Sequence, residues 1–349
     1  CPEACGTGGA PPALAVAARI AEPLPANAEL ASWDATGKET AMTTMKAVRA
    51  HHPLGPEALT YDDVLTPALT PGDALVRVHA AGISPAEFTW HIWETPDGRS
   101  RLPAIPSHEV SGVVAAVTPE AQEVAIGDAV YALADFFRDG AAAEYIAVRA
   151  ADLAPKPLTL NHAQAAATPL SGLTAWQALF DHARLTPGQR VLIHGAAGGV
   201  GSFAVQLAHW RGAHVIGTAS ARNRNFVREL GADEVIDYRA TPFETTLRDV
   251  DIVFDTIGGT TLERSWSVLR RDGVLVTIVR PPSPDWADAR EARGVFFIVE
   301  PRRDQLQELG RLIDAGSVRP MVEAVIPLAQ ARAAYARGAR EHPRGKLVL

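Results

Sequence analysis

Short apolar runs alternate with helical segments through the second half of the chain. The runs have the length of strands, and we expect strands at residues 191–193, 214–217, 231–236, 251–255 and 273–278. Polar segments of helical character separate several of these runs, as at residues 222–230. Strands that are apolar without alternation are typical of a parallel sheet with both faces buried. The pattern therefore predicts a doubly wound α/β domain, with helices on both faces of the sheet.

The pattern becomes β-rich between about residues 45 and 150. Apolar runs punctuated by proline and glycine are expected to form strands at residues 74–80, 110–117, 127–132 and 142–148. Strands at this spacing predict an antiparallel, barrel-like domain. Near the end of the α/β half, a further apolar run from Phe296 to Val299 predicts the last strand of the parallel sheet.

The first 44 residues have neither pattern. They are rich in alanine, proline and glycine and lack sustained periodicity, so we expect a disordered or extraneous extension. Deletion of residues 1–41 should therefore leave folding and turnover intact. An alternative is that Cys1 carries the lipid of a processed lipoprotein, but that would require a signal peptide that is not in this sequence.

Composition narrows the function classes. The chain has 349 residues, 47% hydrophobic and 21% charged, which is enough for two globular domains. A net charge of −7 and scattered arginines do not favour nucleic-acid binding, and no run of 18 apolar residues predicts a membrane span. Cys1 and Cys5 are the only cysteines, so beyond residue 5 a disulfide, a thiolate nucleophile and cysteine-bound zinc are excluded. We expect a cytoplasmic protein.

A glycine-rich turn follows the apolar run at residues 191–193. Gly198 and Gly201 match the second and third glycines of the dinucleotide-binding fingerprint, whereas Ala196 stands at the first position. The pyrophosphate would then bind at the N-terminus of the helix that begins near Val200. The alternative is a glycine-rich turn that binds nothing.

The end of the next strand indicates the kind of nicotinamide cofactor. An NADH-specific domain usually has an acidic residue there, about 20 residues past the loop, to bind the ribose 2′-hydroxyl. This chain reads GTASARNR at residues 217–224 and has no acid. Arg222 offers a permanent charge and Ser220 a neutral donor for a 2′-phosphate, which predicts NADPH. The alternative is that Arg222 is a solvated charge on a helix face.

A series of short motifs, taken in order, resembles one known superfamily. The motifs are GISPAE (82–87), PSHEVSGVV (106–114), GDAV (127–130), LTAWQAL (173–179), GGVG (198–201), GAD (231–233) and GKLVL (345–349). Together they resemble the medium-chain dehydrogenase/reductase superfamily, most closely its zinc-independent quinone oxidoreductase branch.

The resemblance implies a fold and a domain division. It implies a GroES-like β-rich catalytic domain at residues 45–165, a Rossmann domain with a doubly wound parallel sheet at 166–302, and a C-terminal return to the catalytic domain at 303–349. It also implies a homodimer in which the strand at Phe296–Val299 meets its twin. Residues 1–44 stay outside the resemblance as an extension.

The departures from the superfamily pattern concern the metal. Zinc alcohol dehydrogenases of the superfamily have a cysteine where this chain has Ser84, and a second cysteine near Leu170. Two of three catalytic zinc ligands are therefore missing, so we expect no metal. His108 and Glu109 remain, and each has an alternative to a functional role. His108 could be a hydrogen-bonded residue at the cleft wall, and Glu109 a packed polar partner near the domain junction.

Without a Lewis acid, the expected substrates are conjugated carbonyl compounds. Charge that develops on a quinone or an α,β-unsaturated carbonyl is delocalised, so a few hydrogen bonds can replace a metal ion. We expect Ser84, Glu87 and His108 to orient substrate or relay a proton. The alternative for Glu87 is a helix cap after Pro85.

The resemblance also places Thr174 against the nicotinamide and Tyr238 on the adenosine side. For Thr174 the alternative is a hydroxyl bonded to its own i−4 carbonyl. The full set of expected cofactor contacts is Thr174, Ala197, Gly198, Gly199, Val200, Gly201, Ser220, Arg222, Asn223 and Tyr238. Two other functions stay open: an enoyl- or alkenal-type reductase with a narrower substrate, and an NADPH-binding sensor or structural protein without catalytic activity.

Overall fold

The computed structural model describes residues 44–349 except residues 54, 91, 96 and 342, and two short strands before them. These strands, β1 (Ser32–Trp33) and β2 (Glu39–Thr40), pair antiparallel. The other residues of 1–43 lie outside the described residues. The expectation of a disordered or extraneous extension therefore stays a prediction.

The α/β half contains a six-stranded sheet in which every pair is parallel. In spatial order its strands are β12 (Glu234–Asp237), β11 (His214–Ala219), β10 (Arg190–Ile193), β13 (Val250–Asp255), β14 (Leu269–Thr277) and β15 (Arg293–Phe296). This arrangement confirms the predicted doubly wound sheet. Because the order reverses between β10 and β13, a ligand site is expected at the carboxyl ends of these strands.

The last strand of the parallel sheet exists as predicted, but the predicted bounds, Phe296–Val299, were wrong: the strand is Arg293–Phe296. β15 ends at Phe296, and residues 297–300 belong to no strand, although the Phe297 N–H still donates to the carbonyl oxygen of Thr277 at 3.4 Å. Phe297 and Val299 are buried in the core to which helix α8 (Arg303–Asp314) contributes. The apolar run therefore begins on the last paired residue of β15, Phe296, and continues as a segment that packs in the core with α8.

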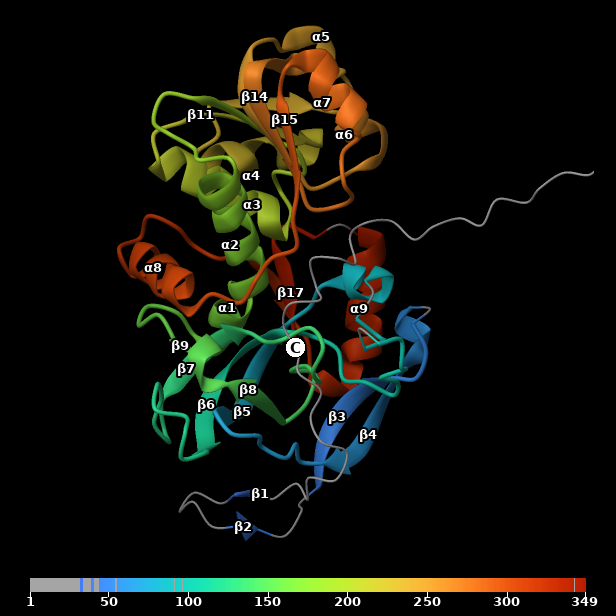
Figure 1. Ribbon diagram of the computed structural model, residues 1–349, viewed down its shortest axis with the longest axis vertical. Coiled ribbons are helices and arrows are strands. Elements are labelled where there is room, and N and C mark those ends of the chain that lie inside the picture. The colour runs from blue at the N-terminus through green and yellow to red at the C-terminus, as the bar shows by residue number, and fades with distance from the viewer. Residues whose placement is uncertain are drawn as a thin grey trace, which may run out of the picture.

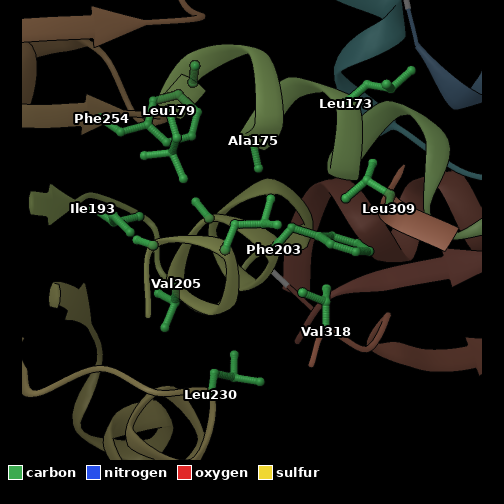
Figure 2. Packing of buried hydrophobic residues seen from close by; sticks show 14 of the residues in the cluster. Leu173, Ala175, Leu179, Ile193, Phe203, Val205, Leu230, Phe254, Leu309 and Val318 are labelled. Atoms are coloured by element: carbon green, nitrogen blue, oxygen red, sulfur yellow. The ribbon is translucent and has the colours of Figure 1, made fainter. Parts of the chain in front are cut away.

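Helices cover both faces of this sheet (Figure 1). They are α2 (Pro169–Trp176), α3 (Gly199–Trp210), α4 (Arg224–Glu229), α5 (Phe243–Thr246), α6 (Gly259–Ser265) and α7 (Pro284–Arg290). Successive residues of β10 enter different cores: Ile193 packs with Phe203 and Phe254, whereas Leu192 packs with Val253 and Trp266 on the opposite face. Figure 2 shows the first of these cores. Burial on both faces explains the unbroken apolar runs.

The other half is a β-rich domain built on a seven-stranded sheet. Along the sheet the strands are β16 (Val322–Val325), β17 (Lys346–Val348), β5 (Asp73–Gly82), β6 (Glu109–Val117), β7 (Ala129–Leu133) and β9 (Ala154–Pro155), with β8 (Tyr145–Arg149) also paired to β5. A hairpin of β3 (Thr44–Ala50) and β4 (Leu59–Leu65) lies beside it. Antiparallel pairs dominate, as predicted.

The C-terminal segment returns to the β-rich domain (Figure 1). After α8 (Arg303–Asp314), which packs on α2 and β9, the chain forms α9 (Ala331–Glu341) and β17. β17 pairs antiparallel with β5, and α1 (His162–Ala166) contacts β5 and β6. None of the helices in the described part of the chain has the length and apolar character needed to cross a bilayer.

Candidate active site

The glycine-rich loop between β10 and α3 contains two glycines with different roles. A Cβ at Gly201 would lie 2.1 Å from the carbonyl oxygen of Gly195, so only glycine lets α3 pack this closely on the loop. Gly198 has an ordinary φ of −78°, and a Cβ there would meet only the Gly195 oxygen, at 3.4 Å. Neither conformation nor packing within the chain requires glycine at 198, which points to a ligand that approaches the backbone there.

The N-terminus of α3 fits the pyrophosphate of a dinucleotide. Its N-cap is Gly198, so no side chain caps the first N–H groups of the helix. Such free donors, together with the helix dipole, favour an anion. Ala197, Gly199 and Val200 lie in the same turn, and the loop therefore fits the nicotinamide cofactor that the sequence predicted.

A polar cavity of about 500 Å³ lies beyond the carboxyl end of β11. Its lining consists of four arginines, two glutamates and an asparagine: Arg222, Asn223, Arg239, Glu323, Arg340, Glu341 and Arg344. Arg344 donates from Nε to Oδ1 of Asn223 (2.7 Å) and from Nη2 to the carbonyl oxygen of Arg222 (2.8 Å). Sequence analysis missed Arg344, because the C-terminal fold alone brings it to this strand end.

The other predicted adenosine-side residues lie around the same strand end. Ser220 is buried, and its carbonyl accepts from the Asn223 N–H at 2.8 Å. Arg222 donates from Nη2 to the carbonyl of Glu341 at 3.3 Å. Tyr238 is 54% exposed, with the Arg239 guanidinium 5.7 Å from its ring centre. Arg222 and Asn223 thus line the cavity, whereas Ser220 and Tyr238 are not among the lining residues.

Thr174 is buried on α2, and its hydroxyl donates to the carbonyl oxygen of Leu170 at 2.6 Å. This is the i−4 bond that the alternative interpretation described. Leu170 in turn donates its backbone N–H to Oε1 of Glu109 at 3.0 Å. The segment near the missing zinc-ligand position is therefore tied to the Ser107-His108-Glu109 motif.

Ser84 and Glu109 are joined by a residue that sequence analysis did not single out. The Lys346 ammonium donates to Oγ of Ser84 at 2.8 Å and forms an ion pair with Oε2 of Glu109. The side chains of Lys346 and Glu109 are only 7% and 2% exposed. Burial raises the pKa of Glu109, while the Lys346 charge opposes that shift. The ending GKLVL is one of the motifs that carry the resemblance, but it gives no sign of where its lysine lies.

Glu87 and His108 form a second buried pair next to this centre. Glu87 does not cap a helix: its Oε2 accepts from the Ser107 N–H at 2.8 Å and lies 3.4 Å from the Tyr335 hydroxyl. Burial raises the pKa of Glu87 to about 8. Glu87 is therefore mostly protonated at neutral pH, which suits a group that holds a proton.

His108 is neutral in this surrounding. Burial lowers its pKa to about 4. Its Nε2 lies 3.3 Å from the carbonyl oxygen of Arg138, and since a carbonyl can only accept, Nε2 carries the hydrogen. Nδ1 then has a free lone pair 3.9 Å from Oε2 of Glu87 and, among the described residues, no hydrogen-bond partner. The two side chains are thus an acid and a base held close together, not an ion pair.

The donor set does not fit a tetrahedral zinc site. Ser84 is hydrogen-bonded to an ammonium group, and Leu170 has no donor atom. Among the described residues no group of three or more histidines, cysteines, aspartates or glutamates is placed to bind a metal ion. The cation of Lys346 already occupies the space between Ser84 and Glu109, and it would repel a metal ion there.

Two family models match the chain. One, described as "Alcohol dehydrogenase GroES-like domain", matches residues 70–158, and one described as "Zinc-binding dehydrogenase" matches residues 230–349. The "Probable zinc-binding oxidoreductase, mitochondrial" of Arthroderma benhamiae is 34% identical over 81% of this chain and 89% of its own length.

Two further proteins are similar over most of the chain. The "NADPH-dependent alkenal/one oxidoreductase, chloroplastic" of Arabidopsis thaliana is 33% identical over 82% of this chain and 74% of its own. The structure of the quinone oxidoreductase from Coxiella burnetii superposes with a TM-score of 0.79 at 31% identity and covers 88% of this chain and 99% of that one. The chain therefore belongs to the medium-chain dehydrogenase/reductase superfamily and, within it, to the quinone oxidoreductase branch.

Proposed function

We propose that this oxidoreductase is zinc-independent and uses NADPH to reduce a quinone or an α,β-unsaturated carbonyl compound. The observation that carries the proposal is the buried Lys346 between Ser84 and Glu109, in the centre where zinc-dependent members of the superfamily hold their metal. A site without a metal favours acceptors that delocalise the charge they gain.

The reaction balances with water as the proton source. NADPH, held at the glycine-rich loop by Gly198 and Gly199, would supply the hydride for a new C–H bond at the β-carbon of the acceptor and would itself be oxidised to NADP⁺. The α-carbon takes a proton from water, so the conjugated C=C bond becomes a single bond. For a quinone, the hydride and one proton from water together deliver two electrons and two protons, which gives the hydroquinone. Glu87 and His108, an acid and a base 3.9 Å apart, can relay the proton.

NADPH is favoured over NADH by the cavity at the end of β11. Arg222 and Arg344 both line it, and no acidic residue stands at the strand end to repel a 2′-phosphate. Glu323 and Glu341 also line the cavity, but both pair with Arg337. The name of the Arabidopsis relative, which includes NADPH, supports the same choice.

We also propose a homodimer formed through β15. This strand is the edge of the six-stranded sheet, and in the described part of the chain its outer side has no partner strand. Ile298 (67%) and Val279 (45%) expose apolar surface nearby. Light scattering of the purified protein tests the oligomeric state.

The cytoplasmic location stays a prediction. Cell fractionation tests it against a mitochondrial location, because the names of several relatives include the word mitochondrial.

The decisive experiment follows oxidation of NADPH at 340 nm with a panel of quinones, alkenals and cyclic enones. Turnover with quinones and enones alike supports the proposal, whereas turnover confined to one class of enone indicates an enoyl- or alkenal-type reductase. Two relatives, the Arabidopsis alkenal/one oxidoreductase and the tomato 2-methylene-furan-3-one reductase, favour that second candidate by their names. Stoichiometric NADPH binding without turnover would instead indicate a sensor or structural protein.

A further inference from the structure

Lys346 is a buried cation whose surroundings do not use all of its hydrogen-bonding capacity. An ammonium group has three N–H donors. Nζ donates to Oγ of Ser84 (2.8 Å) and forms an ion pair with Oε2 of Glu109, an oxygen that accepts no hydrogen bond from the described residues; no other acceptor among these residues lies within hydrogen-bond distance of Nζ. A buried donor without a partner is costly, so a free third donor indicates a ligand that accepts from it.

The position of Lys346 links it to the cofactor loop. Gly345, the residue before it, donates its N–H to the carbonyl of Ala197 at 3.0 Å. The stem of Lys346 lies across the start of α3: a Cβ at Gly199 would come within 2.9 Å of its Cδ. The ammonium therefore lies one side-chain length from the helix N-terminus that fits the pyrophosphate, on the side where Ser84 replaces a metal ligand.

The partners of Lys346 keep its charge in place. Glu109 is itself fixed, since its Oε1 accepts from the Leu170 N–H at 3.0 Å. Ser84 lies at the start of the short helix after β5, and the residue as a whole is only 8% exposed. A cation held in a fixed direction in a water-poor site stabilises developing negative charge without reorganisation, as a metal ion does.

Resting on the proposed function, we propose that Lys346 is a catalytic residue that takes over the electrostatic task of the missing metal. Its ammonium donates a hydrogen bond to the carbonyl oxygen of the acceptor, and this bond strengthens as the oxygen gains negative charge. Ser84 and Glu109 act as positioning residues that aim the ammonium. The competing role is a cation that binds the cofactor pyrophosphate, which would act on cofactor affinity and not on the rate of reduction.

The test compares Lys346→Met, which keeps the length of the stem and removes the charge, with Lys156→Met as a matched control. Lys156 is partly buried, and within the described part of the chain its ammonium donates only to the backbone carbonyls of Pro157 and Leu160. With an enone, kcat of Lys346→Met should fall about 100-fold, the loss typical of one transition-state donor. The dissociation constant for NADPH, measured by titration calorimetry, should change less than about threefold.

A second acceptor distinguishes a catalytic role of Lys346 from a merely structural role. A quinone of high reduction potential accepts hydride readily, so its kcat should fall clearly less than that of the enone. Damage to the site would lower both rates alike. If Lys346→Met does not fold because it leaves Glu109 unpaired, Lys346→Met/Glu109→Gln removes both charges of the pair, and the same rate and binding results are expected of it.

Two results would overturn the role of Lys346: an enone kcat within about threefold of the wild type, or a weakening of NADPH binding that accounts for the whole loss of activity. The second result would assign Lys346 to the pyrophosphate. If the proposed function itself is wrong, the result is different: the wild-type protein and the Lys156→Met control also turn over no acceptor.

Discussion

The backbone N–H of Gly345 donates to the carbonyl oxygen of Ala197 at 3.0 Å, and so joins the C-terminal strand to the cofactor loop. Gly345 has a φ of +71°, and a Cβ there would lie 2.1 Å from the carbonyl oxygen of Met321, so this contact requires glycine. Its two neighbours then point to different places: Arg344 to the end of β11 and Lys346 to Ser84. One short segment thus reaches both places where we expect the cofactor to bind.

Removal of metal ions should leave the activity unchanged. Ser84 and Leu170 supply no thiolate, and the Lys346 cation stands beside the Glu109 carboxylate. Dialysis against a strong chelator, followed by the NADPH assay and metal analysis, measures the effect. Stoichiometric zinc whose removal abolishes activity would contradict the prediction.

Replacement of Arg344 by alanine should raise the dissociation constant for NADPH about tenfold or more, with little change for NADH. A charge-assisted hydrogen bond to the 2′-phosphate contributes roughly 1.5–3 kcal/mol, and NADH lacks that phosphate. Arg222→Ala should show the same selectivity. The control is Arg332→Ala, an exposed arginine of α9 that does not line the cavity. Equal losses for the two cofactors would show that this cavity does not bind the phosphate.

Two loop glycines should respond differently to alanine. Gly198→Ala should keep the stability of the protein but weaken NADPH binding strongly, since its Cβ makes only an ordinary van der Waals contact with the Gly195 oxygen (3.4 Å) and would stand where the pyrophosphate is expected. Gly201→Ala should lower the free energy of unfolding by about 1–3 kcal/mol, because its Cβ would overlap the carbonyl of Gly195. Urea unfolding and calorimetric titration separate the two effects. Loss of stability in Gly198→Ala with unchanged affinity would reverse the assignment.

Glu87→Gln should change how stability depends on pH. The pKa of Glu87 is raised from 4.5 to about 8, so the folded protein binds more protons at this site than the unfolded protein between these values. The free energy of unfolding therefore falls as pH rises through this window, by up to about 1.4 kcal/mol per pH unit from this group. Glu87→Gln should remove that slope.

The window for this measurement is pH 7 to 8. The pKa of His108 is lowered from 6.5 to about 4, so below pH 6.5 its contribution has the opposite sign and would mask that of Glu87. Urea unfolding of the wild type, of Glu87→Gln and of the exposed control Glu120→Gln gives the three slopes. Parallel wild-type and Glu87→Gln profiles would show that Glu87 is ionised in the folded protein.

Local patterns in the sequence were sufficient for the architecture. Periodicity identified the parallel sheet and the β-rich domain because the number of buried faces of a strand determines the order of its apolar residues. Gly198 and Gly201 stood out for the same reason, since close approach of backbone to a ligand or a helix excludes side chains locally. The absence of an acid after β11 and of cysteines beyond residue 5 was equally readable.

The charged centre was decided by the tertiary structure. Arg344 and Lys346 reach their sites only because β17 pairs with β5 and Gly345 contacts Ala197, which joins segments far apart in the chain. The protonation of Glu87 and His108 depends likewise on burial, a property of the packed molecule. Sequence periodicity records what each residue does within its own element, whereas electrostatic partners across elements are fixed only when the elements pack together.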